Sequence, residues 1–480
     1  MTRAWLVAFA VVSFASVASV AAADGAEKPG AAKGPYVTSV SDTTATVRVE
    51  LRAAATIALE MAPEGVPVGA GSAAPVHFAS APAATMHVVN ATGLSPATRY
   101  AYTVRAGGVV VATGHLATAP ARDSADTTTA HTFIVYGDDR TDDDAHAAIV
   151  RAIIARTPAD FLVNTGDLVA DGGSSANWAT FFDIERDLLR ARPLFAAIGN
   201  HELYDDAAGA NFSRYFGFAD GGGAMRPYGT VRFGAVRFFF LNGMHDWNSG
   251  PEREWLEREL SNADHEPGLT WRFAVVHQGP WSSGPHGPNA RLAAAHVPEL
   301  LAAHHLDLVF SGHDHIYERG DAGLLKYVVS GGGGAPLYRD IHPTPTTRKA
   351  EAAHHFLEVT TRGDAFQMTV HRLDGSVLDR CGFSHGASKD GPWDCDPAPV
   401  SAPSLSSASP AASPSGAPSA GQAPPSSSSR PGACACDALG GGAERSFGAC
   451  AACASMLLFG GGVRRYARRR CAPSPRPSRV

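Results

Sequence analysis

Five short segments of this chain each end an apolar run with a side chain that can bind a metal ion. In residues 309–319, VFSGHDHIYER, two histidines separated by one aspartate follow a Ser-Gly pair: His313 and His315. The other four segments supply Asp138 (VYGDDR), Asp167 (NTGDLVADG), Asn200 and His201 (AIGNHE), and His277 and His286 (VVHQGPWSSGPHG). In all but the VVH segment a glycine precedes the first such residue, where the chain must turn sharply.

Carboxylate, amide and imidazole groups in this combination suit two metal ions about 3.5–4 Å apart that share one bridging carboxylate. Mixed nitrogen and oxygen ligands favour iron, manganese or zinc and argue against a thiolate site. The cysteines agree with this interpretation, because none of the seven lies between Asp24 and Arg380. Each motif alone is weak evidence, whereas all five in order predict a dinuclear metal centre.

These side chains can meet only if the preceding strands share one layered domain. Apolar strands are predicted at 132–137, 160–166, 194–199, 272–277 and 306–312. Helical patterns alternate with them at 144–156, 252–260 and 291–306, and hairpins are predicted at 228–243 and 354–380. Ligands of open α/β sheets bind outside the carboxyl ends of the strands, so we expect the candidate side chains to converge. The pattern predicts an α/β domain over residues 131–380.

The ordered series GD, GD, GNHE, VVH and GHDHIYER resembles the calcineurin-like metallophosphoesterases, and GHDHIYER is most similar to the purple acid phosphatases. The resemblance covers roughly residues 34–380. It implies a four-layer αββα metallophosphoesterase sandwich, preceded by a small all-β sandwich domain.

The resemblance also implies a role for each candidate residue. Asp167 would bridge the two ions. His201 would bind neither ion and would instead protonate the leaving group. The other ligands would divide between the ions, with Asp138 and His315 on the first and Asn200, His277 and His313 on the second.

Two positions depart from the family pattern. Purple acid phosphatases have a tyrosine ligand to ferric iron three residues after the bridging aspartate, where this chain has Ala170. Other metallophosphoesterases have a metal-binding histidine two residues after the first aspartate, where this chain has Arg140. The first ion would therefore lack its usual fourth protein ligand. We expect a colourless or pale protein even with iron, and a weaker preference for Fe³⁺ over Mn²⁺.

Arg140 and His286 are candidate substrate-binding residues, each with an alternative. The Arg140 guanidinium could bind phosphate oxygens in a bidentate manner, or it could form a salt bridge with the aspartates at 142–144. His286 lies in a loop rich in glycine and proline, and could contact substrate or be an ordinary loop histidine.

Residues 34–120 alternate apolar and polar positions with frequent turn residues, and Gly107-Gly108 indicates a hairpin. The segment GLSPATRYAYTV (93–104) resembles the fibronectin type III domains. We predict a small β-sandwich without catalytic residues, and a generic antiparallel sheet would have the same consequence.

The two ends of the chain predict export and surface attachment. Residues 1–23 combine a basic head, an apolar centre and an A-x-A site, typical of a signal peptide. Residues 396–433 are rich in Pro, Ser and Ala and predict a flexible linker. Residues 434–470 carry cysteines, an uncharged stretch and an arginine cluster, and resemble the MYXO-CTERM sorting tail. That resemblance implies a partner in the membrane or the sorting machinery, and a location in the cell envelope, at the cell surface or released. A plain membrane anchor is the alternative for the tail.

Together these features predict an exported phosphatase that cleaves small phosphomonoesters by attack of a metal-bound hydroxide. A phosphodiesterase or a nucleotide or pyrophosphate hydrolase could use the same site. A non-catalytic, surface-displayed binding protein on a vestigial phosphatase fold is the alternative from another class. The formal charge of −6 gives no reason to expect nucleic acid as a partner.

Overall fold

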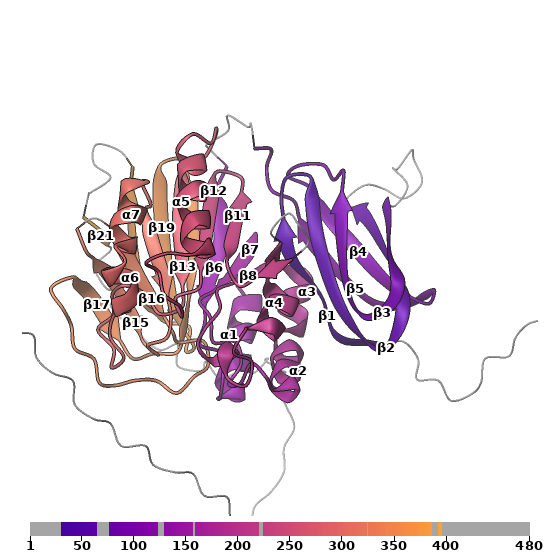
Figure 1. Ribbon diagram of the computed structural model, residues 1–480, viewed down its shortest axis with the longest axis horizontal. Helices are drawn as coiled ribbons and strands as arrows, with labels where there is room; N and C mark the ends of the chain where they lie inside the picture. Colours follow the sequence, from indigo (N-terminus) through magenta and orange to yellow (C-terminus); the bar gives the residue numbers. More distant parts are fainter. Residues whose placement is uncertain are drawn as a thin grey trace, which may run out of the picture. The chain divides into compact units, whose positions relative to one another are not determined.

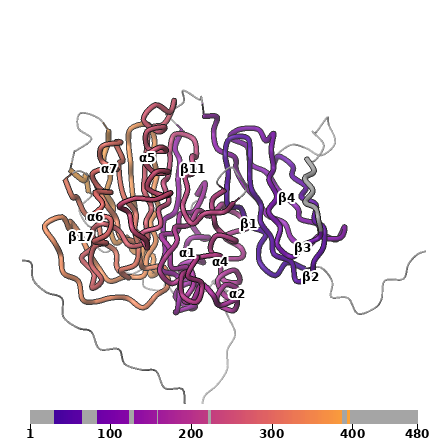
Figure 2. Tube along the Cα trace, in the orientation of Figure 1, coloured from indigo at the N-terminus to yellow at the C-terminus, as the bar shows by residue number. Residues whose placement is uncertain are grey.

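The computed structural model describes residues 30–64, 76–122, 129–156, 159–219, 224–323, 325–385 and 392–395. An all-β region is followed by a larger α/β domain, and Figures 1 and 2 follow the chain from one to the other by colour. The predicted signal peptide, linker and sorting tail lie outside the described residues. Within the described part of the chain, no helix is long and apolar enough to cross a membrane.

The N-terminal region is built from five strands in one hydrogen-bonded sheet. They are β1 (Ala31–Val40), β2 (Thr44–Pro63), β3 (Val76–Thr92), β4 (Arg99–Ala106) and β5 (Val109–Ala117). β2 pairs with β1 over its first half and with β4 over its second half. Gly107 and Gly108 have φ of 56° and 84° and form the turn between β4 and β5, as predicted. The resemblance to fibronectin type III domains stays a prediction.

The α/β domain contains two seven-stranded sheets. The first has the order β21-β20-β19-β18-β6-β7-β8, with β6, β7 and β8 parallel. Its strands are β6 (His131–Tyr136), β7 (Phe161–Asn164), β8 (Leu194–Ala196), β18 (His355–Arg362), β19 (Ala365–Arg372), β20 (Val377–Ser384) and β21 (Asp394–Cys395). A disulfide between Cys381 and Cys395 joins β20 to β21 and closes the loop between these two strands.

The second sheet has the order β11-β12-β13-β14-β16-β15-β17, with β12, β13, β14 and β16 parallel. Its strands are β11 (Gly229–Phe233), β12 (Val236–Leu241), β13 (Trp271–Val276), β14 (Leu308–Ser311), β15 (Tyr317–Asp321), β16 (Lys326–Ser330) and β17 (Thr347–Glu351). A short ladder pairs β9 (Phe218–Ala219) with β10 (Met225–Arg226). β11 pairs with β12 in an antiparallel manner, and so do β18 with β19 and β19 with β20. The predicted hairpins at 228–243 and 354–380 are therefore present.

Helices cover the outer face of each sheet (Figure 1). One set is α1 (Asp143–Ile154), α2 (Ser175–Ile184), α3 (Arg186–Ala191) and α4 (Ala210–Phe216), whose apolar residues pack with those of β6, β7 and β8. The other set is α5 (Pro251–Asp264), α6 (Ala290–Ala294) and α7 (Val297–Ala303), which packs on β12, β13 and β14. A single 3₁₀ turn, η1, spans His201–Leu203.

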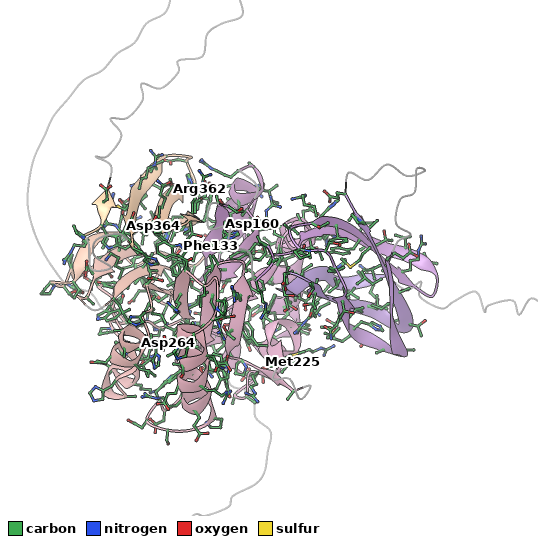
Figure 3. All side chains as sticks on the ribbon, turned by 90° about the horizontal axis from the view of Figure 1, so that it is seen from above. Phe133, Asp160, Met225, Asp264, Arg362 and Asp364 are labelled. Carbon is green, nitrogen blue, oxygen red and sulfur yellow. A yellow bond between two sulfur atoms is a disulfide. The ribbon has the colours of Figure 1, made fainter. Side chains whose placement is uncertain are left out.

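The inner faces of the two sheets meet in an aromatic core. Phe133 of β6 lies 5.1 Å from Phe238 of β12 and 6.2 Å from Phe310 of β14, measured between ring centroids. Figure 3 labels Phe133 among the side chains between the strands. Its neighbour Ile134 points outward and packs against the helices instead. This alternation along β6 is the period of two that a strand buried on both faces requires, and it confirms the four-layer αββα arrangement.

Two helix predictions need correction. The segment 291–306 forms two short helices rather than one, because His296 between them has φ of 53° and cannot continue a right-handed helix. In α1, Ile149, Val150 and Ile153 are buried, whereas Ile154 is 47% exposed. The helical period of residues 144–156 places these four residues on one face, so the buried stripe of α1 is narrower than that period predicts.

Candidate metal centre

The predicted ligands lie at the carboxyl ends of parallel strands from both sheets. Asp138, Asp167 and Asn200 come after β6, β7 and β8 of the first sheet. His277 and His313 come after β13 and β14 of the second sheet. Each sheet brings its own strand ends to one edge, and the face-to-face packing places the two edges together.

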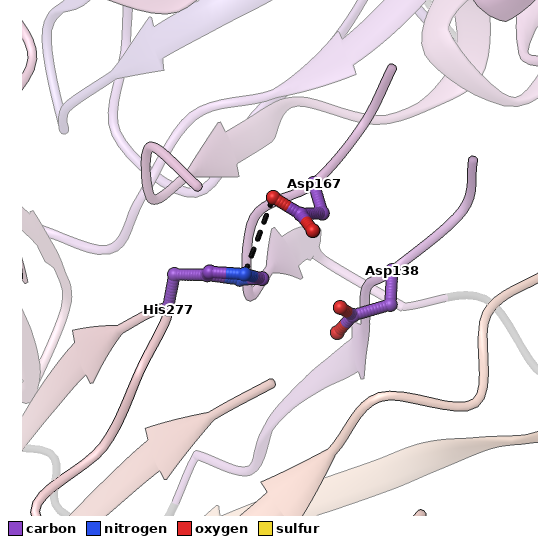
Figure 4. A group of neighbouring side chains, drawn as sticks. All are labelled: Asp138, Asp167 and His277. Carbon is purple, nitrogen blue, oxygen red and sulfur yellow. Dashed lines mark ion pairs between the residues drawn. The ribbon is translucent and has the colours of Figure 1, made fainter. Parts of the chain in front are cut away.

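Four of the side chains form one group around His277. Its Nε2 atom lies 3.2 Å from Oδ1 of Asp167, 3.2 Å from Oδ1 of Asn200 and 3.3 Å from Nδ1 of His313. Figure 4 shows the Asp167–His277 pair, with the Asp138 carboxylate beside it. Two donors that each sit about 2.1 Å from a shared ion lie roughly 3 Å apart. The spacing of this group therefore fits the predicted second ion.

A second, smaller group contains Asp138 and His315. Oδ1 of Asp138 lies 3.6 Å from Nε2 of His315. Donor atoms of Asp138, Asp167 and His277 all lie within 4.8 Å of one another, and all three residues are buried. The two groups thus adjoin at Asp167, and this arrangement fits the predicted first ion.

Hydrogen bonds orient the imidazole rings toward the centre. Nδ1 of His277 donates to the carbonyl oxygen of Thr165 at 2.9 Å, and Nδ1 of His315 donates to that of Pro336 at 2.7 Å. Each bond leaves Nε2 as the atom that faces the carboxylates. Outer partners of this kind fix the tautomer and the ring angle of a metal-binding histidine.

The backbone at the centre is strained. Asp138, Asp167 and His313 have φ of 60°, 56° and 70°, in the left-handed region that non-glycine residues rarely adopt. Such conformations cost on the order of 1–3 kcal/mol each and cluster at functional sites. The preceding glycines are required by close approach: a Cβ at Gly166 would lie 2.7 Å from Nδ1 of His277, and one at Gly199 would lie 2.5 Å from the Asp167 nitrogen.

The electrostatics of the centre favour a bound cation. Burial opposes ionisation of Asp167, but His277, His201 and Arg140 outweigh it and hold the pKa of that carboxyl far below its usual range. Burial, together with the charge of Asp167, raises the pKa of Asp138 well above its usual value. Burial and the charge of His277 lower the pKa of His313 to about 3, which keeps its imidazole neutral. The Asp138 carboxyl, whose ionisation burial opposes, and the neutral imidazole of His313 are donors that fit a metal ion.

Residues 131–317 match the family model of the calcineurin-like phosphoesterases. This part of the chain is therefore similar to the calcineurin-like metallophosphoesterases. Among curated proteins, probable purple acid phosphatase 20 of Arabidopsis thaliana is 29% identical over 244 residues, which cover 45% of this chain and 56% of the relative. Purple acid phosphatase 15 of the same plant is 30% identical over 173 residues, or 33% of this chain and 32% of the relative. The chain thus spans about a third to a half of these relatives.

Solved structures show the same fold. The purple acid phosphatase PPD1 from yellow lupin seeds superposes with a TM-score of 0.60 at 17% identity, over 73% of this chain and 74% of that one. The structure of PhoD superposes with a TM-score of 0.58 at 11% identity, over 76% of this chain and 91% of that one. The metallophosphoesterase architecture is therefore confirmed.

Arg140 of the α/β domain points into the centre rather than toward the aspartates at 142–144. Its Nε donates to Oδ2 of Asp167 at 3.0 Å, and its Nη2 lies 3.2 Å from Nε2 of His315. The acidic run serves α1 instead: Asp142 caps the helix by accepting from the Ala145 nitrogen, and the next two aspartates lie in the first turn. Arg140 therefore lies among the candidate ligands, and its role in substrate binding stays a prediction.

His201 and His286 lie on either side of the ligands. Nδ1 of His201 donates to the carbonyl oxygen of Ala170 at 2.7 Å, while Nε2 lies 3.9 Å from Oδ2 of Asp167. Nδ1 of His286 lies 3.0 Å from Oδ1 of Asp314, and its ring is 4.5 Å from that of His313. The His286 side chain is 44% exposed, as a substrate contact should be. The roles of both residues stay predictions.

Two buried carboxylates support the centre and were not singled out from the sequence. Glu202 accepts from the backbone nitrogens of Asp167 and Gly199 at 3.0 and 2.7 Å. Asp314 accepts from the backbone nitrogen of His286 at 3.0 Å and from the hydroxyl of Ser282. Both residues lie inside motifs, GNHE and GHDH, whose other members were assigned, and that position was the available signal.

A second buried cluster begins at Asp139, the residue after Asp138. Asp139, His146 and Glu185 bring their donor atoms within 4.8 Å of one another. Nε2 of His146 lies 2.9 Å from Oε1 of Glu185, which also accepts from the Tyr136 hydroxyl at 3.0 Å. Asp139 accepts from the Asn164 amide at 2.6 Å. This network connects α1 and the end of α2 to β6 and β7. These two strands lead into the loops that carry Asp138 and Asp167.

The His146–Glu185 pair should make stability depend on pH. Burial lowers the pKa of His146, but the hydrogen bond to Glu185 and the charge of Asp139 outweigh it, so the net pKa is raised. A raised pKa adds stability fully below the unfolded value of about 6.5, and that stability is lost as pH rises through the folded value. We expect His146→Gln to lower the free energy of unfolding at about pH 6 by roughly 3–5 kcal/mol, and by less at about pH 9.

Denaturant unfolding of both proteins at the two pH values measures this difference. His304→Gln is the control, because its pair with Asp264 is partly exposed and should contribute only about 0–1 kcal/mol. A loss for His146→Gln that stays constant between the two pH values would show that the charge of His146 does not stabilise the fold.

Ala170 leads to a prediction about colour. Tyr136 cannot supply the missing phenol, because its buried hydroxyl donates to Glu185 on the helix side of β6. We expect the iron-loaded protein to lack an intense visible band and Ala170→Tyr to gain one, because a tyrosinate oxygen at this position would reach the first ion. Visible absorption spectra of the two proteins test this, with Ala170→Phe as the control that adds a ring without an oxygen. An intense band in the unsubstituted protein would contradict it.

Proposed function

We propose that this chain is a dinuclear-metal phosphatase that hydrolyses phosphomonoesters. The observation that carries the proposal is the position of Asp167. Its Oδ1 lies 3.2 Å from Nε2 of His277 in one donor group, while its Oδ2 lies 3.0 Å from Nε of Arg140, beside the other group. Donor atoms of Asp138, Asp167 and His277 also lie within 4.8 Å of one another, so this carboxylate adjoins both groups, as a bridging ligand must.

The six predicted ligands would hold two ions of iron, manganese or zinc. Such ions supply Lewis acidity and lower the pKa of water to near neutrality. The chain's own residues bind the ester and move a proton. Arg140 would donate to oxygens of the phosphoryl group, as guanidinium groups do in fork geometry. His201 in its imidazolium form would pass the Nε2 proton to the departing oxygen and would remain neutral, with its Nδ1 hydrogen on the Ala170 carbonyl. His286 would contact the substrate from the exposed side.

Hydrolysis of 4-nitrophenyl phosphate by the purified full-length chain tests the proposal. The protein should be loaded separately with Mn²⁺, Zn²⁺ and iron, and its metal content measured by mass spectrometry. We expect about two ions per chain and turnover with at least one metal. Two bound ions without turnover of any monoester would contradict the proposal.

A phosphodiester substrate is the second outcome of the same experiment. Bis(4-nitrophenyl) phosphate differs from the monoester only in the second aryl group and in charge. A higher kcat/KM for the diester would move the proposed substrate class to phosphodiesters. Fewer than one ion per chain with no activity on either ester would instead support the non-catalytic binding protein.

We also propose that the protein is exported and held at the cell envelope. The proposal rests on the residue pattern of segments 1–23 and 434–470 alone. Sequencing of the mature N-terminus from the native cell should begin at Asp24 or close to it. A mature protein that retains residues 1–23 and fractionates with the cytoplasm would overturn it.

A further inference from the structure

Residues 331–338, GGGGAPLY, run along the first-ion side of the centre. The backbone nitrogens of Gly333 and Ala335 donate to the carbonyl oxygens of Gly137 and Asp138 at 2.8 and 2.7 Å. The carbonyl oxygen of Pro336 accepts from Nδ1 of His315 at 2.7 Å. This segment is therefore bonded to both loops that carry the predicted first-ion ligands.

The glycines allow this close packing. A Cβ at Gly333 would lie 2.5 Å from the carbonyl oxygen of Gly137, and a Cβ at Gly334 would lie 2.5 Å from that of Asp139. Any side chain at either position would push the segment away from the Asp138 loop. Tyr338 comes four residues after Gly334, and backbone contacts of this segment hold it in position.

Tyr338 lies beside the first-ion group. Its ring stacks on the ring of His315, with centroids 4.1 Å apart and planes 15° apart, and it lies 5.2 Å from the ring of His286. Its backbone nitrogen donates to the His315 carbonyl oxygen at 3.2 Å. Burial raises the pKa of its hydroxyl, and the nearby Arg140 guanidinium opposes that rise. Tyr338 therefore lies near three residues that already belong to the centre.

The hydrogen-bonding chemistry of the two groups decides what the hydroxyl can do. A guanidinium has five donor hydrogens and no acceptor, so Arg140 cannot accept the hydrogen of the Tyr338 hydroxyl. A tyrosine hydroxyl is a donor as well as an acceptor. Its hydrogen is therefore available to an anionic group that binds beside Arg140 and His315.

We propose that Tyr338 is a substrate-contacting residue whose hydroxyl donates a hydrogen bond to a phosphoryl oxygen, beside Arg140. The inference rests on the proposed function, because it assumes that a phosphoryl group binds at this centre. Arg140 and Tyr338 together present a cation and a neutral donor to the same anionic group, which gives direction as well as charge. The stacked ring on His315 keeps the hydroxyl in place.

Tyr338→Phe isolates the hydroxyl, because phenylalanine retains the ring that stacks on His315. Binding of inorganic phosphate to the metal-loaded full chain is measured by calorimetry. Loss of a hydrogen bond to a charged group should weaken phosphate binding about 10- to 100-fold, with the metal content unchanged. KM for 4-nitrophenyl phosphate should rise in the same direction. Tyr228→Phe is the control, since Tyr228 packs on Trp255 at 5.2 Å between ring centroids and should leave phosphate binding unchanged.

Two results would overturn the inference. Phosphate affinity within about twofold of the unsubstituted protein would show that Tyr338 only packs on His315. A fall in metal content, or loss of a visible band from the iron-loaded protein, would show that the hydroxyl binds the ion instead. Failure of the proposed function is distinguishable from both. Phosphate that binds in a Tyr338-dependent manner without ester turnover supports the contact and rejects the phosphatase.

Discussion

Replacing Asp167 with asparagine is expected to remove both metal ions and to lower kcat/KM for a phosphomonoester by about 10³-fold or more. Asp167 is 0% exposed, and its donor atom lies within 4.8 Å of those of His277 and Asp138, which belong to different groups. Asparagine keeps the shape of the side chain but has one oxygen, carries no charge and cannot bridge two cations. The loss should therefore affect metal content and activity together.

Metal content by mass spectrometry and kcat/KM on the same preparation measure this effect. Asp171→Asn is the matched control, because Asp171 lies four residues further along the same loop and its carboxylate accepts from the backbone nitrogen of Gly173 at 2.8 Å. We expect the control to keep about two ions per chain. Two retained ions in Asp167→Asn would show that another group bridges the centre.

Replacing His201 with alanine should cost about 10²- to 10⁴-fold in kcat for an alkyl phosphate, and much less for 4-nitrophenyl phosphate. The contribution of a general acid to the rate increases with the basicity of the departing oxygen. An alkoxide requires the proton, whereas nitrophenolate leaves readily without it. The His201 ring is held for this task by the 2.7 Å bond from Nδ1 to the Ala170 carbonyl, which leaves Nε2 toward the centre.

The ratio of the two losses is the decisive measurement, since a merely structural effect would reduce both substrates alike. His342→Ala serves as the control, because the His342 side chain is 73% exposed and contacts only Asp340. Equal losses on the alkyl and aryl esters would reject His201 as the general acid. Unchanged metal content in His201→Ala would show, in addition, that this histidine is not a ligand.

The candidate ligands could be predicted because local patterns encode them. Each follows an apolar strand and, in four segments, a glycine at a sharp turn. The structure shows why glycine stands there: a Cβ at Gly166 would meet Nδ1 of His277, and the next residue adopts φ of 56°. The strand period and the turn are short-range properties, so the sequence states them directly.

The boundaries of some elements could not be predicted, because they depend on single backbone conformations. The helical pattern over 291–306 is continuous in apolar period, yet His296 takes a left-handed conformation and divides α6 from α7. Ile154 matches the apolar period of α1, but its side chain is exposed to solvent. In both cases tertiary packing overrides the local preference.

The sequence by itself determined the α/β layering, the order of the strand-end motifs and the chemistry of the donor set, since these follow from hydrophobic period, glycine position and residue type. Only the tertiary structure decided where Arg140 points. Its partner His315 is 175 residues away, and the competing aspartates are two to four residues away. Only the tertiary structure decided the contacts of Glu202 and Tyr338 as well. A contact between distant segments depends on how the two sheets pack and how each loop turns at its strand end, and no local period records that.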